Sequence, residues 1–179
     1  HHRGSIFGAR PEGQPSQKTF ESRLSAAILA LDPDRPVVLE AESSRIGNRS
    51  LPQSLWQAMR AAPRIAVAAP LAERARYLAR TYDDVTADQT YLLDLIQRLS
   101  PLHSKEVIAG WAALAQDRSF EALAADLMAQ HYDPRYSKQR EKGTGGTPLD
   151  FPVAALDSAS LDQAAAALAQ AIRAMPGFR

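Results

Sequence analysis

Residues 37–47 read Val-Val-Leu-Glu-Ala-Glu-Ser-Ser-Arg-Ile-Gly, and their pattern decides how the rest of the sequence is interpreted. Three consecutive apolar residues, two of them β-branched, are typical of a strand buried on both faces. The run then turns polar, with Glu40, Glu42 and Ser43 at what would be the carboxyl end of the strand. Ligands of open α/β sheets bind at that end. A strand that runs out into a solvated loop fits the pattern equally well.

Composition limits the classes of protein to consider. The 179 residues suit one domain of ordinary size, and the net charge of +1 gives no global field that argues for nucleic acid or a membrane. The absence of cysteine excludes disulfides, thiolate nucleophiles and cysteine-based metal sites within this sequence. No apolar run approaches the roughly 20 residues of a spanning helix, and no signal peptide is visible, so we expect a cytoplasmic protein.

Alternating strand and helix patterns predict the α/β class. Ser16 can cap a helix that ends near Asp32, and residues 37–41 form the first predicted strand. Ser50 is the predicted cap of a second helix, which has a buried stripe that includes Leu55 and Met59. Residues 65–69 form a second buried strand, and a helix over residues 71–82 follows Pro70. This order predicts βαβ units and a parallel sheet.

The second half of the sequence is predicted to be helical. Residues 87–128 carry three apolar stripes at helical spacing, and residues 131–136 break the pattern. Residues 148–153 predict a last strand, at an edge because of its prolines. Ser158 or Ser160 would cap a closing helix. We therefore expect an α/β part over residues 1–86, a helical segment over 87–142 and a final strand and helix over 143–179, packed as a single domain.

Three features of the sequence argue against common sites. The glycine-rich residues 143–147 lack the lysine of a phosphate loop and are followed by Pro148. No two histidines have the i, i+4 spacing of a helical metal site, so we expect no zinc, and we interpret His131 as a helix-end residue. Glu40 and Glu42 lie two positions apart at the end of the predicted strand, and we do not interpret them as a carboxylate dyad. A contact to Mg²⁺ or a nucleotide, or an ion pair with an arginine, remains open.

Two basic segments are candidates for binding anions. Arg74, Arg76 and Arg80 lie on one predicted helix, where guanidinium forks match phosphate oxygens, although an ordinary solvated helix face is the favoured interpretation. A second segment mixes aromatic rings, which stack on unpaired bases, with cations that meet phosphates. A helix C-terminus is also naturally basic. The residues of this second segment are Tyr132, Arg135, Tyr136, Lys138, Arg140 and Lys142.

Together, these motifs resemble one family, the bacterial tRNA 2-selenouridine synthases, in their C-terminal P-loop-type region. The matching segments, in order, are His2-Arg3-Gly4-Ser5-Ile6-Phe7-Gly8, Gln14 to Glu21, Val38 to Gly47, Leu51-Pro52, Pro70 with Arg74 and Tyr82, and Tyr132-Asp133-Pro134-Arg135-Tyr136. The resemblance spans most of the sequence. It implies a partial P-loop-NTPase-like parallel sheet with flanking helices and a helix-rich C-terminal half.

The resemblance also implies a reaction. Family members replace the sulfur of 2-thiouridine at the wobble position of tRNA by selenium, with selenophosphate as the donor, through an S-geranylated intermediate made from geranyl diphosphate. The substrates are the tRNAs for Lys, Glu and Gln. An anion or substrate site is implied at His2, Arg3, Gly4, Ser5, Gln17, Ser43, Arg45 and Arg74, with Glu40 and Glu42 near Mg²⁺ or a nucleotide. The implied tRNA contact is the aromatic and basic segment from Tyr132 to Lys142.

The sequence departs from the family in two respects. The family has an N-terminal rhodanese-like domain with an active cysteine, and a Walker A loop just before the His-Arg-Gly-Ser segment; neither is in these 179 residues. We therefore expect a fragment of a longer enzyme, without a catalytic residue of its own and inactive alone. The alternatives are a fragment of a P-loop nucleotide kinase or NTPase outside this family, or a non-catalytic helical interaction module.

Overall fold

The computed structural model describes residue 7 and residues 13–41, 43–140 and 147–175, with only the backbone of residues 137–140. The chain divides into two compact units. Unit 1 comprises residues 1–66, 142–151 and 163–179, and unit 2 comprises residues 67–141 and 152–162. The three-part domain division expected from the sequence stays a prediction. No helix among the described residues is long and apolar enough to cross a membrane.

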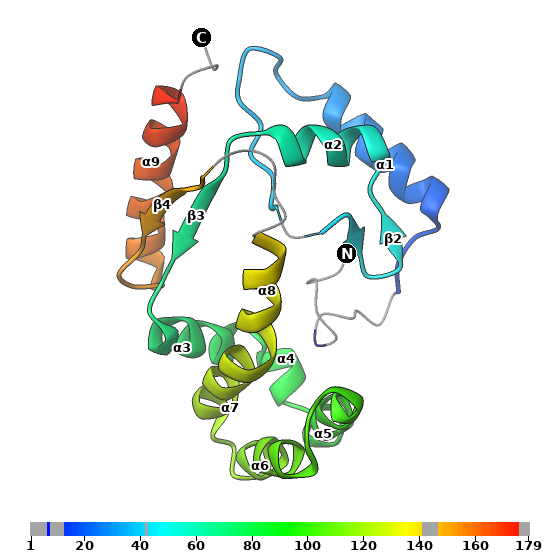
Figure 1. The fold of residues 1–179 in the computed structure, drawn as a ribbon, viewed down its shortest axis with the longest axis vertical. Helices are drawn as coiled ribbons and strands as arrows, with labels where there is room; N and C mark the ends of the chain where they lie inside the picture. The colour runs from blue at the N-terminus through cyan, green and yellow to red at the C-terminus, as the bar shows by residue number, and fades with distance from the viewer. Residues whose placement is uncertain (1–6, 8–12, 42, 141–146, 176–179) are drawn as a thin grey trace. The chain divides into compact units, whose positions relative to one another are not determined.

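Unit 1 begins with helix α1 (Gln17–Leu29), which starts where the sequence predicts (Figure 1). The Ser16 side chain accepts a hydrogen bond from the Thr19 N–H, which satisfies one of the unpaired donors of the first turn. Strands β1 (Arg45–Ile46) and β2 (Arg49–Ser50) then form an antiparallel hairpin, with Gly47 at a φ of 58° in its two-residue loop. The sequence analysis predicted no strand at these positions. Glycine at the first loop position is the usual choice for such a turn.

The strand predicted over residues 37–41 is not formed, so the prediction of a buried strand at this position is wrong. These residues form no strand ladder, and the side chains of Val37, Val38 and Leu39 are 50%, 65% and 50% exposed. Their β-branched character favours an extended backbone, but a strand also needs a hydrogen-bonded neighbour. Because the described residues supply no such neighbour here, the apolar segment stays at the surface.

Helix α2 (Gln53–Ala61) follows Pro52, which is its N-cap in place of the predicted Ser50. Leu55 and Met59 are half-buried, so the predicted buried stripe is only partly covered. Neither α1 nor α2 contains a buried residue. Among the described residues of unit 1, Phe7 and Ile172 are the buried hydrophobic side chains.

Strands β3 (Ile65–Ala68) and β4 (Leu149–Pro152) pair in parallel (Figure 1). The sequence predicted both strands and a parallel sheet, but it derived that sheet from residues 37–41 and 65–69. The Leu149 N–H donates to the Arg64 carbonyl at 2.9 Å, and the Val153 N–H donates to the Ala68 carbonyl at 2.8 Å. The pairing joins two segments far apart in the sequence, which confirms the α/β class. β3 is half-buried to exposed, so the prediction of full burial is wrong.

Unit 2 holds the main hydrophobic core. Its helices are α3 (Leu71–Thr81), α4 (Asp83–Thr86), α5 (Gln89–Gln97), α6 (Lys105–Gln116) and α7 (Phe120–Leu127), and the short 3₁₀ turn η2 (Ser100–Leu102) joins α5 to α6. Helix α3 packs on α7, and α6 packs on both α5 and α7. Trp111, Leu95 and Ile96 are the largest fully buried side chains of the described chain. The predicted helical stripes of this half are therefore confirmed.

The helical path does not break at residues 131–136, contrary to the prediction. Helix α7 passes into a π-helical turn, η3 (Met128–Tyr132), and then into α8 (Asp133–Arg140) (Figure 1). The Asp133 N–H donates to the Met128 carbonyl, five residues earlier. Pro134 has no N–H for a regular α-helical bond and its ring would crowd the preceding turn. The wider π turn changes the register just before this proline, so the helix continues.

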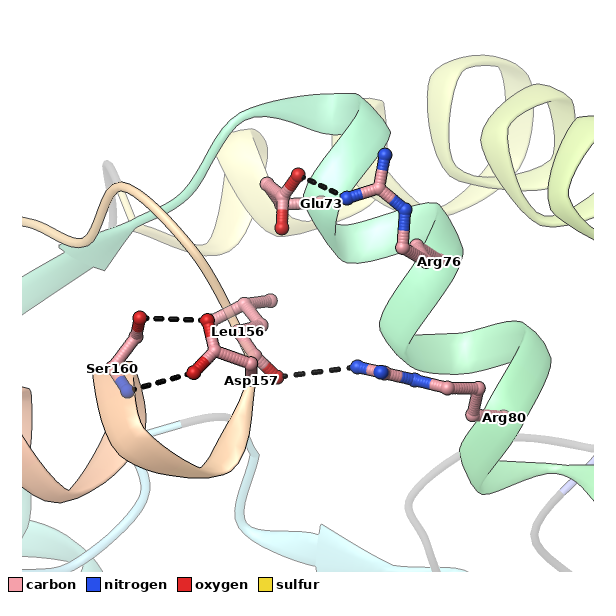
Figure 2. Close-up of polar contacts among 6 residues, drawn as sticks. All are labelled: Glu73, Arg76, Arg80, Leu156, Asp157 and Ser160. Carbon is pink, nitrogen blue, oxygen red and sulfur yellow. Dashed lines mark hydrogen bonds and ion pairs between the residues drawn. The ribbon is translucent and has the colours of Figure 1, made fainter.

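The last helix is α9 (Ser158–Ala174), and its cap differs from the predicted serines. The Asp157 carboxylate accepts from the Ser160 N–H at 3.0 Å and from the Ser160 hydroxyl at 2.7 Å, as Figure 2 shows. These hydrogen bonds hold the pKa of Asp157 below its usual value. Asp157 is therefore the N-cap, since its carboxylate satisfies the donors of the first turn.

Candidate functional site

Two glutamine side chains fix the β1–β2 hairpin of unit 1. The Gln14 amide donates to the Ile46 carbonyl and accepts from the Asn48 N–H, both at 2.7 Å. The Gln17 amide donates to the Ser50 carbonyl at 2.8 Å and accepts from the Ser50 N–H at 3.0 Å, as a neighbouring strand would. Gln17, a predicted substrate-binding residue, is thus engaged in holding backbone in this structure.

The other described residues of the predicted anion site also lie in unit 1, except Arg74. The Ser43 hydroxyl accepts from the Arg45 N–H at 3.1 Å, and the Arg45 side chain is exposed. Glu40 is exposed as well. His2, Arg3, Gly4, Ser5 and Glu42 lie outside the described residues. Their anion-binding and Mg²⁺-binding roles therefore stay predictions, and no group of three His, Asp or Glu side chains in the described chain is arranged to hold a metal ion.

The three arginines of α3 each have a partner within unit 2. Arg76 forms an ion pair with Glu73 one turn earlier, and Arg80 donates to the Leu156 carbonyl at 3.4 Å, beside the Asp157 cap (Figure 2). Arg74 binds Asp133. Arg76 is half-exposed at 51%, so its pair is a surface contact of the kind that contributes little. The interpretation of an ordinary helix face suits Arg76 best.

Arg74 makes the strongest polar contact of α3. Its two terminal nitrogens each donate to one carboxylate oxygen of Asp133, at 2.8 Å in both cases. This contact joins α3 to the first residue of α8 across 59 positions of sequence. The hydrogen bonds to Asp133 raise the pKa of Arg74. Paired parallel hydrogen bonds of this kind fix geometry as well as adding energy.

A series of aromatic rings surrounds the π-helical turn in unit 2. The His103 ring lies edge-on to Trp111 at 4.7 Å between centroids and bonds to His131, with Nε2 to Nδ1 at 2.8 Å. The His131 ring lies edge-on to Tyr132 at 4.8 Å, and Tyr132 stacks with Tyr136 at 6.3 Å. The series therefore runs from a fully buried ring to half-buried tyrosines.

The base of this series is fixed by a second polar network. The Trp111 indole donates to the Asp126 carboxylate at 2.8 Å, and the Gln130 amide donates to the same carboxylate at 2.8 Å. Asp126 lies on α7, and Gln130 lies in η3. Helix α6 is thereby attached to the π turn. π turns inside α-helices frequently occur at functional sites.

His131 is a buried histidine, only 5% exposed. Burial lowers its pKa to about 4, and the positive charges of Arg135 and of His103, when protonated, act in the same direction. The imidazole is therefore neutral at pH 7, and one of the two facing nitrogens of the histidine pair carries the proton. The interpretation of His131 as a helix-end residue is too narrow, because its ring belongs to the core beneath the tyrosines.

The structure brings together part of the predicted tRNA contact. Tyr132 and Tyr136 stack on one another, and Arg135 between them in the sequence is exposed. Lys138 and Arg140 lie in α8, where only the backbone is described, and Lys142 lies outside the described residues. The site as described is thus a pair of tyrosine rings beside a basic helix. Which of these residues touch tRNA stays a prediction.

Sequence reasoning missed Asp133 and His103 as parts of this arrangement. Asp133 lies in the segment that was predicted to break the helical pattern, and His103 lies within residues 87–128, where only apolar stripes were considered. A signal was present, since Asp133 is the only carboxylate in the segment Tyr132–Tyr136 that the sequence singled out. Its partner Arg74 is 59 residues away, and no local pattern identifies such a contact.

Comparison with known proteins gives a consistent result. A family model described as the tRNA 2-selenouridine synthase AAA domain matches residues 1–94. The tRNA 2-selenouridine synthase of Alcanivorax borkumensis is 43% identical over 177 residues, covering 81% of this chain and 48% of its own length. Those of Hahella chejuensis and Cupriavidus pinatubonensis are 35% and 31% identical, covering 75% and 79% of this chain. No solved structure matches significantly.

The alignments cover only part of the length of each relative. The aligned regions span 31%, 46% and 48% of the three relatives' lengths, so the chain spans half or less of the proteins it matches. The family match nevertheless covers more than half of the chain, and its AAA description agrees with the parallel strand pair and flanking helices of the structure. The chain belongs to the tRNA 2-selenouridine synthase family, within which residues 1–94 match the AAA domain.

Proposed function

We propose that this chain is part of a transferase that converts 2-thiouridine to 2-selenouridine at the wobble position of tRNA. Selenophosphate is the selenium donor, and geranyl diphosphate supplies the geranyl group of an S-geranylated intermediate. The proposed RNA partners are the tRNAs for Lys, Glu and Gln. The relatives carry the name tRNA 2-selenouridine synthase, which supports the tRNA and the selenium but not the individual steps.

The observation that carries the proposal is the tyrosine pair formed by the last residue of the π-helical turn and a residue of α8. Tyr132 and Tyr136 stack at 6.3 Å, and the exposed Arg135 lies between them in the sequence. Stacked rings beside cations are what unpaired bases need, because every base has an aromatic face and a nearby phosphate. We assign the RNA contact to this pair, Arg135 and the following basic residues Lys138, Arg140 and Lys142.

The anion site is the second part of the proposal. Selenophosphate and geranyl diphosphate both carry phosphate oxygens, which arginine, serine and backbone N–H groups bind. We assign this role to the segment His2–Ser5 together with Ser43 and Arg45, and we place Glu40 and Glu42 near any Mg²⁺. The exposed side chain of Arg45 supports a role in binding rather than in packing. The chain alone is expected to be inactive, because it has no cysteine and no Walker A loop.

The RNA contact can be tested in the full-length enzyme that contains this chain. Arg135→Glu, and separately Lys138→Glu with Arg140→Glu, should weaken binding of a substrate tRNA. They should also flatten the dependence of log Kd on log salt by about 1 per lost phosphate contact. Tyr136→Ala should weaken binding by roughly 5-fold to 100-fold, the range measured for loss of one stacked base.

A matched control is available on α6. Lys105 is an exposed lysine in the first turn of that helix, and Lys105→Glu changes the net charge by the same amount as Arg135→Glu. Lys105→Glu should leave the tRNA Kd unchanged when both variants are compared at a salt concentration that screens the long-range effect of net charge. Equal effects of Lys105→Glu and Arg135→Glu would show that the segment Tyr132–Lys142 is not the RNA contact.

A further inference from the structure

The ion pair between Arg74 and Asp133 joins two separate helices of unit 2, α3 and α8. Both terminal nitrogens of Arg74 bond to the carboxylate at 2.8 Å, and the two side chains are 33% and 39% exposed. The remaining Nε atom of Arg74 is buried and has no hydrogen-bond partner. The guanidinium therefore has no exposed fork left for a second anion while Asp133 is bound.

Asp133 occupies a sensitive position in the chain. Its N–H closes the π turn on the Met128 carbonyl, and Pro134 follows directly without an N–H. The backbone hydrogen bond reaches five residues back at this point and Pro134 supplies no donor, so side-chain contacts add to what holds the first turn of α8. A side-chain contact made at Asp133 therefore affects the positions of the residues that follow it, in particular Arg135 and Tyr136.

The opposite side of the turn is also held. His131 bonds to His103, and Gln130 bonds to Asp126, which itself binds the Trp111 indole. These contacts fix the inner face of η3 on α6 and the connection before it. Arg74 adds a contact at the first turn of α8, because its guanidinium binds Asp133 from helix α3.

We propose that Arg74 and Asp133 are positioning residues for RNA binding. The pair fixes the first turn of α8 on α3, and this places Tyr136 and Arg135 where the tRNA meets them. The inference rests on the proposed RNA contact and deepens it. It also gives Arg74 a role different from the direct anion contact that the sequence suggests. The two roles predict opposite results when the charges of the pair are exchanged.

The test uses the full-length enzyme with a substrate tRNA. Arg74→Ala and Asp133→Asn should each raise the tRNA Kd and the KM for tRNA by roughly tenfold, as expected for loss of a charge-assisted pair. The KM for selenophosphate should stay unchanged. The exchange Arg74→Asp with Asp133→Arg restores an ion pair between α3 and α8, and it should recover most of the tRNA affinity.

A neighbouring pair on the same helix supplies the control. Exchange of Glu73 and Arg76 reverses an ion pair between two residues three positions apart on α3, so this contact does not join α3 to α8. It should leave the tRNA Kd unchanged. Circular dichroism melting of every variant shows whether the helices are intact, and Asp133→Asn, which keeps the shape of the side chain, serves where Arg74→Ala does not fold.

Three outcomes overturn the inference. If Arg74 binds a substrate anion directly, the KM for selenophosphate or geranyl diphosphate rises in Arg74→Ala, and the charge exchange does not rescue it. If the single variants bind tRNA as the parent enzyme does, the pair does not position the contact, although the proposed RNA contact survives. If the parent enzyme itself does not bind tRNA, both the proposed function and this inference fail.

Discussion

Neutral His131 in the core of unit 2 makes the stability of the chain depend on pH in a defined window. Burial lowers the pKa of this imidazole from 6.5 to about 4. The unfolded chain, in which the pKa returns to its ordinary value, therefore binds more protons than the folded chain between these two values. Stability should rise with pH through this window and should be lost as the pH falls from 6.5 towards 4.

The magnitude follows from the two pKa values. At pH 5 the imidazole is almost fully protonated in the unfolded chain and mostly neutral in the folded chain. With an allowance for water at the ring edge, His131 should cost about 1–2 kcal/mol of the free energy of unfolding between pH 7 and pH 5. Proton uptake also places a second positive charge beside Arg135 and opposite His103.

The assay is urea unfolding at pH 7 and at pH 5, followed by circular dichroism, for the parent chain and for His131→Asn. Asparagine keeps a nitrogen or oxygen near the position of Nδ1, so the contact to His103 can persist, but it does not titrate. The carboxylates contribute equally to the pH dependence of the free energy of unfolding in both proteins. The parent should lose about 1–2 kcal/mol more than the variant. An equal loss in the two proteins would refute the buried, neutral state of His131.

The remaining predictions concern the other contacts. Gly47→Ala should destabilise unit 1 by at least about 1–2 kcal/mol, because the φ of 58° disfavours a side chain. The new Cβ would also lie 2.5 Å from Gln14 Oε1. The control is Gly110→Ala in α6, where a Cβ meets no atom within 4 Å, and it should be neutral or slightly stabilising in the same unfolding experiment. Trp111→Phe should cost about 1–3 kcal/mol in thermal melting, because it removes a donor to Asp126; no change would show that Gln130 alone satisfies that carboxylate. Leu95→Ala, at 1% exposure, should cost about 2–5 kcal/mol. Val38→Ala, at 65% exposure, should change the free energy of unfolding by less than about 0.5 kcal/mol, and a large loss there would mean that the segment is covered in solution.

The sequence predicted best what local periodicity determines. The helices of unit 2, the strands β3 and β4 and the Ser16 cap follow from apolar spacing, prolines and capping residues within a few positions. The hairpin at Arg45–Ser50 was missed because its strands are two residues long. Its stability comes from Gln14 and Gln17, more than 30 positions away. The strand expected at Val38 failed for the complementary reason, since extended propensity does not supply a neighbouring strand.

The sequence identified the tyrosines and the arginine of the candidate site, but it missed the contacts that hold them in place. Tyr132, Arg135 and Tyr136 were identified from their types and order in the sequence. Their supports, His103 and the Arg74–Asp133 pair, depend on contacts across 28 and 59 positions. A proline and a polar run also concealed the π turn, which has no simple periodic signature. The predicted anion site has residues that lie outside the described chain, so its assembly stays a prediction.

The uneven burial described above has a consequence for how this protein should lose its structure. Unit 1 has helices without a buried residue, whereas unit 2 contains the fully buried Trp111, so the two units should open at different free energies. Each unit contains one of the two tryptophans, Trp56 in α2 and Trp111 in α6. Tryptophan fluorescence of Trp56→Phe, which retains Trp111, and of Trp111→Phe, which retains Trp56, would thus report two separate unfolding transitions. A single melting temperature would describe the part around Trp111 and would conceal an earlier loosening around Trp56.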